Sequence, residues 1–172
     1  MEQASLDYAV VGGNAVAAWV ATVDAGAVRN TRDVDLLLRR SDVPLAILAM
    51  QKAGFLHRRL GNVDVFLDAA QATGDELKGR RVDEAVHLVF AREYVREEYA
   101  LPAPGFDEVE RLDEFAVIGL EALVRMKLTS YRRKDQVHIL DLVGVGLVDS
   151  GWLERFPSPL DARLKELLDN PD

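Results

Sequence analysis

The sequence predicts a small mixed α/β (α+β) fold, a compact sheet flanked by helices and followed by a helical C-terminal extension. In the first half, short apolar runs typical of strands alternate with segments whose apolar residues recur every three to four positions. Residues 100–111, "ALPAPGFDEVER", interrupt this periodicity, and helix-like patterns dominate after them. We therefore expect a core over residues 1–105 and a helical segment, packed on that core, over residues 106–172.

Four short runs in the expected core have the composition of strands, at residues 8–11, 33–38, 62–68 and 84–91. Two helices are expected among them, at residues 14–26 and about 42–53, each with a glycine at its end. The last two strands form a hairpin whose polar connection includes residues 72–81. The sequence therefore predicts two strand-to-helix units and a hairpin.

Three helices are expected in the C-terminal segment, at residues 117–133, 135–145 and 160–169. The first carries an inward-facing apolar stripe at helical spacing, formed by Leu120, Leu123, Val124, Leu128 and Tyr131. Lys127 lies on the same stripe, so its ammonium group either reaches water along the edge of the helix or faces an anion inside the protein. The second alternative makes Lys127 a candidate phosphate ligand, with Arg132 as another, whereas Arg39, Arg40, Arg80 and Arg81 are expected to be solvated.

Composition excludes several classes of site. The formal charge of −8 and the pI near 4.9 argue against a protein that coats DNA through general phosphate attraction. The absence of cysteine excludes disulfides, cysteine-based zinc sites and thiol nucleophiles. The N-terminal apolar stretch is interrupted by "GGN" and has no preceding basic region, so we expect a cytoplasmic protein without a membrane partner.

The strand at residues 33–38 begins with two aspartates, Asp33 and Asp35, separated by one residue. Alternate side chains of a strand share a face, so the two carboxylates converge and repel each other unless a cation lies between them. Mg²⁺ is commonly held by one or two carboxylates together with substrate phosphates. The alternative is a solvated strand end whose aspartates pair with nearby arginines, namely Arg29, Arg32 or Arg39.

The glycine pair Gly12 and Gly13 stands where a strand turns into a helix. Glycine permits a positive φ and a close backbone approach, and the N-terminus of the following helix presents unpaired N–H groups to an anion. A phosphate would fit there, with Asn14 and Thr31 as further candidate contacts. The alternative is a simple tight turn in which Asn14 caps the helix.

The order of these motifs resembles the nucleotidyltransferase superfamily of DNA polymerase beta type, in which a glycine–glycine turn precedes an aspartate-x-aspartate strand. Here the matching segments are "GGNA" and "RNTRDVDLLL". The segment "LEALVRMKLTSYRRKDQVHILDLV" is similar to the abortive-infection and minimal nucleotidyltransferases of toxin–antitoxin systems, through Lys127, Arg132 and Lys134-Asp135. The resemblance covers about residues 8–143, and it implies a nucleotidyltransferase fold with Mg²⁺, or Mn²⁺, held by Asp33 and Asp35.

The chain departs from this family at the third carboxylate, which normally lies on a strand beside the pair. The first hairpin arm offers Asp64 or Asp68 for this position, whereas the second arm has His87 at the corresponding place. Histidine is a poor Mg²⁺ ligand, but an imidazole can take a proton from a hydroxyl. His87 is therefore either a general base or an ordinary half-buried strand residue. Asn14 is a second departure, because the family often has serine or threonine there.

The resemblance implies an enzyme that moves a nucleoside monophosphate from an NTP, expected to be ATP, to an acceptor hydroxyl. The acceptor stays open among tRNA, a protein side chain and a small molecule such as an aminoglycoside. A toxin with an antitoxin partner and an antibiotic-modifying enzyme are both compatible with this chemistry. The alternative is a catalytically inactive nucleotide- or partner-binding module on the same fold, because fold alone does not decide activity.

Overall fold

The computed structural model describes residues 5–29, 31–61, 63–70, 85–112 and 115–171. Its strands are β1 (Ala9–Val11), β2 (Val34–Leu38), β3 (Phe55–Leu60), β4 (Val63–Asp68), β5 (Val86–Phe90), β6 (Val109–Leu112) and β7 (Phe115–Ile118). They form one mixed sheet in the order β3-β4-β5-β2-β1-β7-β6. The pairs β2–β5 and β1–β7 are parallel, and the others are antiparallel. The strands that carry the predicted motifs, β1, β2 and β5, are therefore neighbours at the centre of the sheet.

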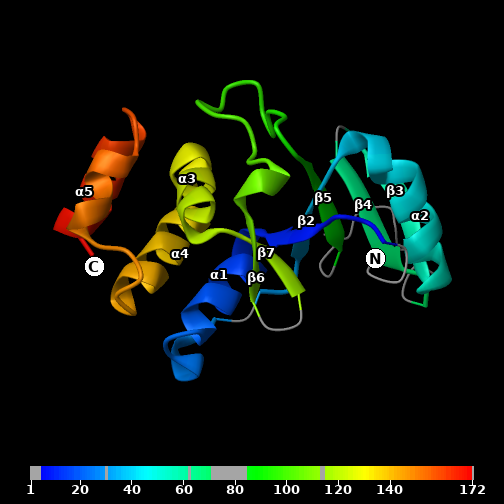
Figure 1. Ribbon diagram of the computed structural model, residues 1–172, viewed down its shortest axis with the longest axis horizontal. Helices are drawn as coiled ribbons and strands as arrows, with labels where there is room; N and C mark the ends of the chain where they lie inside the picture. The colour runs from blue at the N-terminus through cyan, green and yellow to red at the C-terminus, as the bar shows by residue number, and fades with distance from the viewer. Residues whose placement is uncertain (1–4, 30, 62, 71–84, 113–114, 172) are drawn as a thin grey trace.

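Helices lie on both sides of this sheet (Figure 1). The α-helices are α1 (Gly12–Ala21), α2 (Val43–Lys52), α3 (Leu120–Ser130), α4 (Arg133–Gly144) and α5 (Leu160–Asp169). Short 3-10 turns are η2 (Ala25–Ala27), η3 (Arg40–Asp42), η5 (Phe106–Glu108) and η6 (Ser150–Arg155). None of the helices among the described residues is long and apolar enough to cross a membrane.

Two hydrophobic clusters divide the core between the faces of the sheet. On one face, Leu36, Leu38 and Phe66 pack with residues of α2. On the other face, Leu37 and Val117 pack with residues of α1, α3, α4 and α5. The alternation of Leu36, Leu37 and Leu38 between the two clusters shows that β2 is buried on both faces, as expected for the middle of such a sheet.

The structure confirms the mixed α/β class, the helical C-terminal part and the hairpin, whose arms are β4 and β5. The predicted hairpin connection, with Arg80 and Arg81, lies outside the described residues. The strand β3 was not expected, because "FLHRRL" has three basic or imidazole side chains and no clean alternation. It pairs with β4 at the end of the sheet, where a solvated face tolerates such residues.

The segment after residue 105 also differs from the expectation of helices alone. Residues 109–118 supply β6 and β7, and β7 lies parallel to β1. Runs of four residues are too short to show a period, and Val117 and Ile118 belong to β7, although they also fit the apolar stripe of α3. The division of the chain at residues 105 and 106 stays a prediction, but the C-terminal part contributes strands to the sheet as well as helices.

Hydrogen bonds from side chains fix the C-terminal helices against the rest of the protein. Trp19 on α1 donates its Nε1–H to the carbonyl oxygen of Ile118 at 3.0 Å. Arg163 on α5 donates from Nη1 to the carbonyl oxygens of Leu128 and Thr129, at 2.6 and 3.1 Å. These two carbonyls lie at the C-terminal end of α3, where intrahelical partners are missing. The position of the corner between α3 and α4 is therefore fixed by α5.

Candidate functional site

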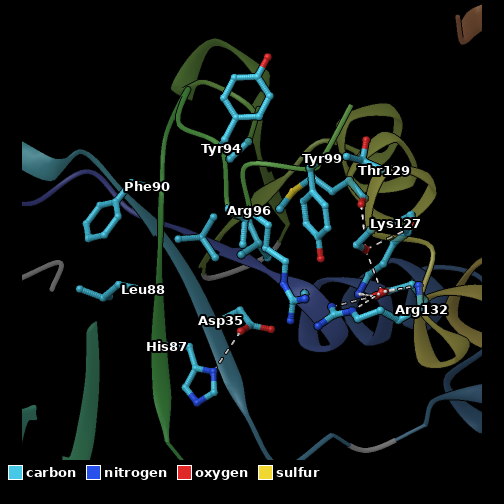
Figure 2. A pocket seen from close by; sticks show the side chains of 18 of the residues that line it. Asp35, His87, Leu88, Phe90, Tyr94, Arg96, Tyr99, Lys127, Thr129 and Arg132 are labelled. Carbon is cyan, nitrogen blue, oxygen red and sulfur yellow. Dashed lines mark hydrogen bonds and ion pairs between the residues drawn. The ribbon is translucent and has the colours of Figure 1, made fainter. Parts of the chain in front are cut away.

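A pocket of about 500 Å³ lies on the face of the sheet covered by α1, α3 and α4. Its walls come from the end of β1, the strands β2 and β5, the loop at residues 91–105 and the corner between α3 and α4 (Figure 2). This volume is in the range of small-molecule and cofactor sites. Eight of the ten residues predicted as catalytic, metal-binding or phosphate-binding line it: Gly12, Gly13, Thr31, Asp33, Asp35, His87, Lys127 and Arg132.

The register of the sheet sets the neighbours of Asp35. Asp35 lies beside Val11 of β1 and His87 of β5. The Nδ1 atom of His87 is 3.8 Å from Oδ1 of Asp35, which is an ion-pair distance but too long for a hydrogen bond. Burial raises the pKa of Asp35 above its ordinary value and Asp33 adds to this, although the charges of His87, Lys127 and Lys134 oppose it. An added cation would therefore stabilise the Asp35 carboxylate.

Two of the three arginines considered as partners of the aspartate pair at a solvated strand end, Arg29 and Arg39, have other partners. The Nε atom of Arg29 lies 2.8 Å from Oδ1 of Asp141 on α4. The Nη1 atom of Arg39 lies 2.7 Å from Oδ2 of Asp7. These pairs weaken the alternative in which Asp33 and Asp35 are ordinary surface charges.

The two glycines make room for side chains of the site. Gly12 has a φ of +70°, and a Cβ atom there would lie 1.9 Å from Oδ2 of Asp35. A Cβ atom on Gly13 would lie 2.5 Å from Cγ2 of Thr31. The N-cap residue of α1, Val11, makes no side-chain capping bond, so the first N–H groups of this helix are not satisfied in that way. The glycine pair thus brings the Asp35 carboxylate against the start of α1.

Asn14 and Thr31 fix the chain just before β2. The Asn14 side chain donates from Nδ2 to the carbonyl oxygen of Asp33 at 2.6 Å, and the Thr31 hydroxyl donates to the same oxygen at 3.3 Å. Asn14 is not among the described residues that line the pocket, whereas Thr31 is. The geometry gives Asn14 a role in positioning the aspartate strand, and its predicted contact with nucleotide stays a prediction.

Lys127 has a buried partner, Asp135, at the start of α4. Its Nζ atom lies 3.2 Å from Oδ1 of Asp135, and the two side chains are 6% and 0% exposed. Asp135 also accepts hydrogen bonds from Arg132 Nε at 2.7 Å and from Ser130 Oγ at 2.8 Å. The ammonium group of Lys127 therefore does not reach water along the helix edge, and it lies in an ion pair on the wall of the pocket.

Burial and charge act against each other in this network. Burial raises the pKa of Asp135, but the hydrogen bond from Arg132, the charge of Lys127 and the hydrogen bond from Ser130 outweigh it and lower the value to about 2. Burial lowers the pKa of Lys127, and the charges of Asp135 and Asp35 only partly oppose this. The carboxylate of Asp135 thus stays ionised at neutral pH and holds two cationic side chains at the pocket.

The structure does not bring Asp64 to the aspartate pair. Val65 is the cross-strand partner of His87, and His87 is the partner of Asp35, so these three side chains share one face of the sheet. Asp64 is on the other face, where its Oδ1 lies 2.9 Å from His57 Nε2.

Asp68 follows the alternation of Asp64 along β4, and its Oδ1 accepts from the backbone N–H of Ala70 at 2.8 Å. Neither hairpin-arm aspartate is therefore placed beside Asp35, and the residue that stands there is His87. Among the described residues, no group of three histidine, aspartate or glutamate side chains is arranged to hold a metal ion.

Two features of the site were missed by sequence reasoning. The first is the full burial of Asp135, which its place in "RRKDQ" does not indicate. The second is the loop at residues 91–105, which brings Arg96 and Tyr99 to the pocket. The conformation of such a loop depends on tertiary contacts, and the sequence offers only its two prolines and a glycine as a signal.

No protein-family model and no curated protein sequence matches the chain. Among solved structures, the chain is similar to the solution structure of the antibiotic-resistance factor ANT(2'')-Ia, described as revealing substrate-regulated conformation dynamics. The alignment covers 99% of this chain and 78% of that chain, with 12% sequence identity and a TM-score of 0.48. Nothing about the chemistry of this chain follows from a likeness at that level.

Proposed function

We propose that the pocket binds a nucleoside triphosphate together with Mg²⁺ and that the protein transfers the nucleoside monophosphate to an acceptor hydroxyl. One observation carries this proposal: a pair of carboxylates, a glycine turn at a helix N-terminus and three cationic side chains from α3, α4 and the corner between them line the same pocket. The carboxylates are Asp33 and Asp35, and the three cations of the α3–α4 corner are Lys127, Arg132 and Lys134. Carboxylates suit a divalent cation, and the cationic groups suit phosphate oxygens.

The donor set at the aspartate pair fits Mg²⁺. Asp33 and Asp35 are alternate residues at the start of β2, both line the pocket, and carboxylate oxygens are the preferred ligands of this ion. Two carboxylates leave the remaining positions to water and phosphate oxygens, which is common for nucleotide sites, and Mn²⁺ accepts the same ligands. When bound, the metal would neutralise charge on the phosphates during transfer.

The protein groups then have separable roles in the proposed reaction. Lys127 and Arg132, oriented by Asp135, bind phosphate oxygens, and Gly12 leaves space for the phosphates to approach the N–H groups of α1. His87 takes the proton of the acceptor hydroxyl, and the oxygen of that hydroxyl forms a bond to the α-phosphorus of the nucleotide. The bond from that phosphorus to the bridging oxygen breaks, and pyrophosphate leaves. Catalysis is mostly positioning and electrostatics, as in other phosphoryl-type transfers.

A second candidate is a nucleotide-binding module without turnover. The observation that favours it is the presence of His87 beside Asp35, in the place where the resembling enzymes have a third carboxylate. With an imidazole there, the site keeps the two carboxylates that hold a metal–nucleotide complex but has a weaker metal ligand. Binding without transfer would follow if His87 is not a base.

The identity of the substrates belongs to this proposal as well. We take ATP as the nucleotide and a hydroxyl of tRNA, a protein or a small molecule such as an aminoglycoside as the acceptor. A toxin role with an antitoxin partner and an antibiotic-modifying role both use this chemistry. The protein's sequence resemblance to minimal nucleotidyltransferases supports the first role.

The test combines binding and transfer. Calorimetry should show ATP binding that requires Mg²⁺ in the wild type, and Asp33→Asn or Asp35→Asn should abolish the metal dependence without loss of folding. Asp7→Asn is a matched control, because Asp7 is an exposed carboxylate that pairs with Arg39 outside the pocket. If both site variants bind Mg–ATP as the wild type does, the proposed role of the pair is wrong.

The same protein incubated with radiolabelled NTPs and each acceptor class distinguishes the two candidates. Label transfer to tRNA, protein or aminoglycoside supports the enzyme. Nucleotide binding with no transfer to any of these supports the binding module.

A further inference from the structure

The loop at residues 91–105 is tied at its base and passes over the pocket. The backbone N–H of Arg92 donates to the carbonyl oxygen of Ala103 at 3.1 Å, and the N–H of Ala103 donates to the carbonyl oxygen of Glu93 at 2.8 Å. Near the tip, the N–H of Tyr99 donates to the carbonyl oxygen of Arg96 at 3.1 Å, which closes a turn. Figure 1 shows this loop rising between β5 and α3. Its base is thus fixed, and its tip presents side chains to the pocket.

Arg96 and Arg132 enter the pocket from different walls. Arg96 comes from the loop, Arg132 comes from the corner between α3 and α4, and in Figure 2 both guanidinium groups point toward the space beside Asp35. Arg132 is held by Asp135, which is buried. The carboxylate near Arg96 is Glu98 at 3.6 Å, and both of these side chains are more than half exposed. Arg96 is therefore the less neutralised of the two arginines.

Two guanidinium groups aimed at one space repel each other unless an anion lies between them. A planar guanidinium with its fork of N–H donors is well suited to phosphate oxygens. The ring of Tyr99 supports Arg96, whose Cζ atom lies 6.0 Å from the ring centroid. The arrangement is thus one that a multiply charged anion would complete.

Arg40 also lines the pocket, but unlike Arg96 it is neutralised by a close carboxylate. Its Nε atom donates to both carboxylate oxygens of Glu93, at 2.8 and 3.0 Å, so its charge is already paired. Its guanidinium also stacks over the ring of Phe90, with Cζ 3.8 Å from the centroid. Arg40 is therefore a structural cation, and among the arginines of this wall Arg96 is the candidate for a ligand contact.

We propose that Arg96 binds the outer phosphates of the nucleotide opposite Arg132, so that the loop at residues 91–105 closes the triphosphate site. This inference rests on the proposed function, because it assigns Arg96 to the same bound triphosphate. It adds a binding residue on a segment that no motif of the sequence marks.

The experiment uses Mg²⁺ with inorganic tripolyphosphate and with ATP, ADP and AMP, so that the phosphate contact is measured with and without a nucleoside. Calorimetry compares the wild type with Arg96→Ala, Arg96→Lys and the control Arg92→Ala. Arg92 lies at the base of the same loop, where it pairs with Asp107 at 2.9 Å, and its side chain is 73% exposed and outside the pocket lining. Thermal unfolding of each variant checks that the fold is intact.

Loss of one charge-assisted phosphate contact should weaken binding of ATP and tripolyphosphate by about 10- to 100-fold in Arg96→Ala. AMP binding and all binding by Arg92→Ala should change little, and Arg96→Lys should recover part of the affinity. Unchanged ATP affinity in Arg96→Ala, or an equal loss for AMP and ATP, would overturn the assignment of Arg96 while leaving the proposed function standing. A wild type that binds none of these ligands would overturn both.

Discussion

Replacing Asp135 by asparagine removes the buried carboxylate that the site depends on. The side chain is fully buried and receives hydrogen bonds from Lys127, Ser130 and Arg132. Asparagine keeps the shape but leaves the buried ammonium of Lys127 without its counter-charge. Breaking a buried ion pair by removing one partner typically costs about 3–5 kcal/mol, so we expect Asp135→Asn to lower the free energy of unfolding by about 3 kcal/mol or more.

The pKa of Asp135 gives an independent magnitude. A carboxyl whose pKa falls from 3.8 to about 2 on folding contributes about 2 kcal/mol above both values. The unfolded state binds the proton more tightly, so this contribution is present above about pH 4 and is lost as the pH falls toward 2. Both oxygens of Asp135 face hydrogen-bond donors, and asparagine puts an NH₂ group in place of one of them, which is why removing the charge by mutation should cost more than removing it by acid.

Urea unfolding at pH 7 and between pH 4 and pH 2, together with thermal unfolding at pH 7, measures both effects. At neutral pH the melting temperature of Asp135→Asn should fall by about 6–12 °C for a chain of this size. Its stability should also lose the part of the acid dependence that comes from Asp135. Lys127→Met should lower the free energy of unfolding less than Asp135→Asn does, because Asp135 keeps its hydrogen bonds from Arg132 and Ser130. In the double variant, Lys127→Met should restore part of the stability that Asp135→Asn removes. A loss below about 1 kcal/mol in Asp135→Asn would refute a buried, paired Lys127.

The remaining predictions concern Gly12 and His87. Gly12→Ala should displace the Asp35 carboxylate and weaken Mg–ATP binding measured by calorimetry, whereas Gly146→Ala, with a similar φ of +77° and open space around its Cβ position, should cost only the conformational strain of about 1–2 kcal/mol. If Gly12→Ala and Gly146→Ala change the affinity for Mg–ATP equally, crowding against Asp35 is unimportant. His87→Gln should lower kcat by about 10²- to 10⁴-fold with little change in nucleotide affinity. An unchanged rate would place the base elsewhere.

The central part of the fold could be predicted from the sequence because its signals are local. The glycine pair, the run "DVDLLL" and the proline-containing start of α2 each determine a boundary through backbone geometry, and the observed bounds agree to within a few residues at these places. The edge strands could not be predicted in this way. β3 carries polar side chains on an edge, and β6 and β7 are too short for a period to appear, so their pairing depends on the sheet already being there.

The candidate site shows the same division. Residues on β1 and β2 come together because strand pairing brings Val11 and Asp35 side by side, which puts the following Gly12 against the Asp35 carboxylate, and this follows once the two strands are known. Alternation along β4 put Asp64 on one face, but only the register with β5 shows that this face is opposite to that of Asp35. The pocket also needed the loop at residues 91–105 and the corner at Arg132, whose positions are set by contacts distant in sequence.

The acidic composition and the cationic wall of the pocket act oppositely on a phosphate ligand. The net charge of −8 is spread over the surface and is screened over about 8 Å at physiological salt, whereas Lys127 is buried and Arg132 lies beside it on the pocket wall. A triphosphate that enters the pocket therefore interacts mainly with these nearby cations. A polyanionic acceptor such as tRNA must also contact the outer surface, where general attraction is absent. Among the proposed acceptors, a protein hydroxyl or a cationic small molecule thus meets the smaller electrostatic barrier, unless a partner protein changes the charge of that surface.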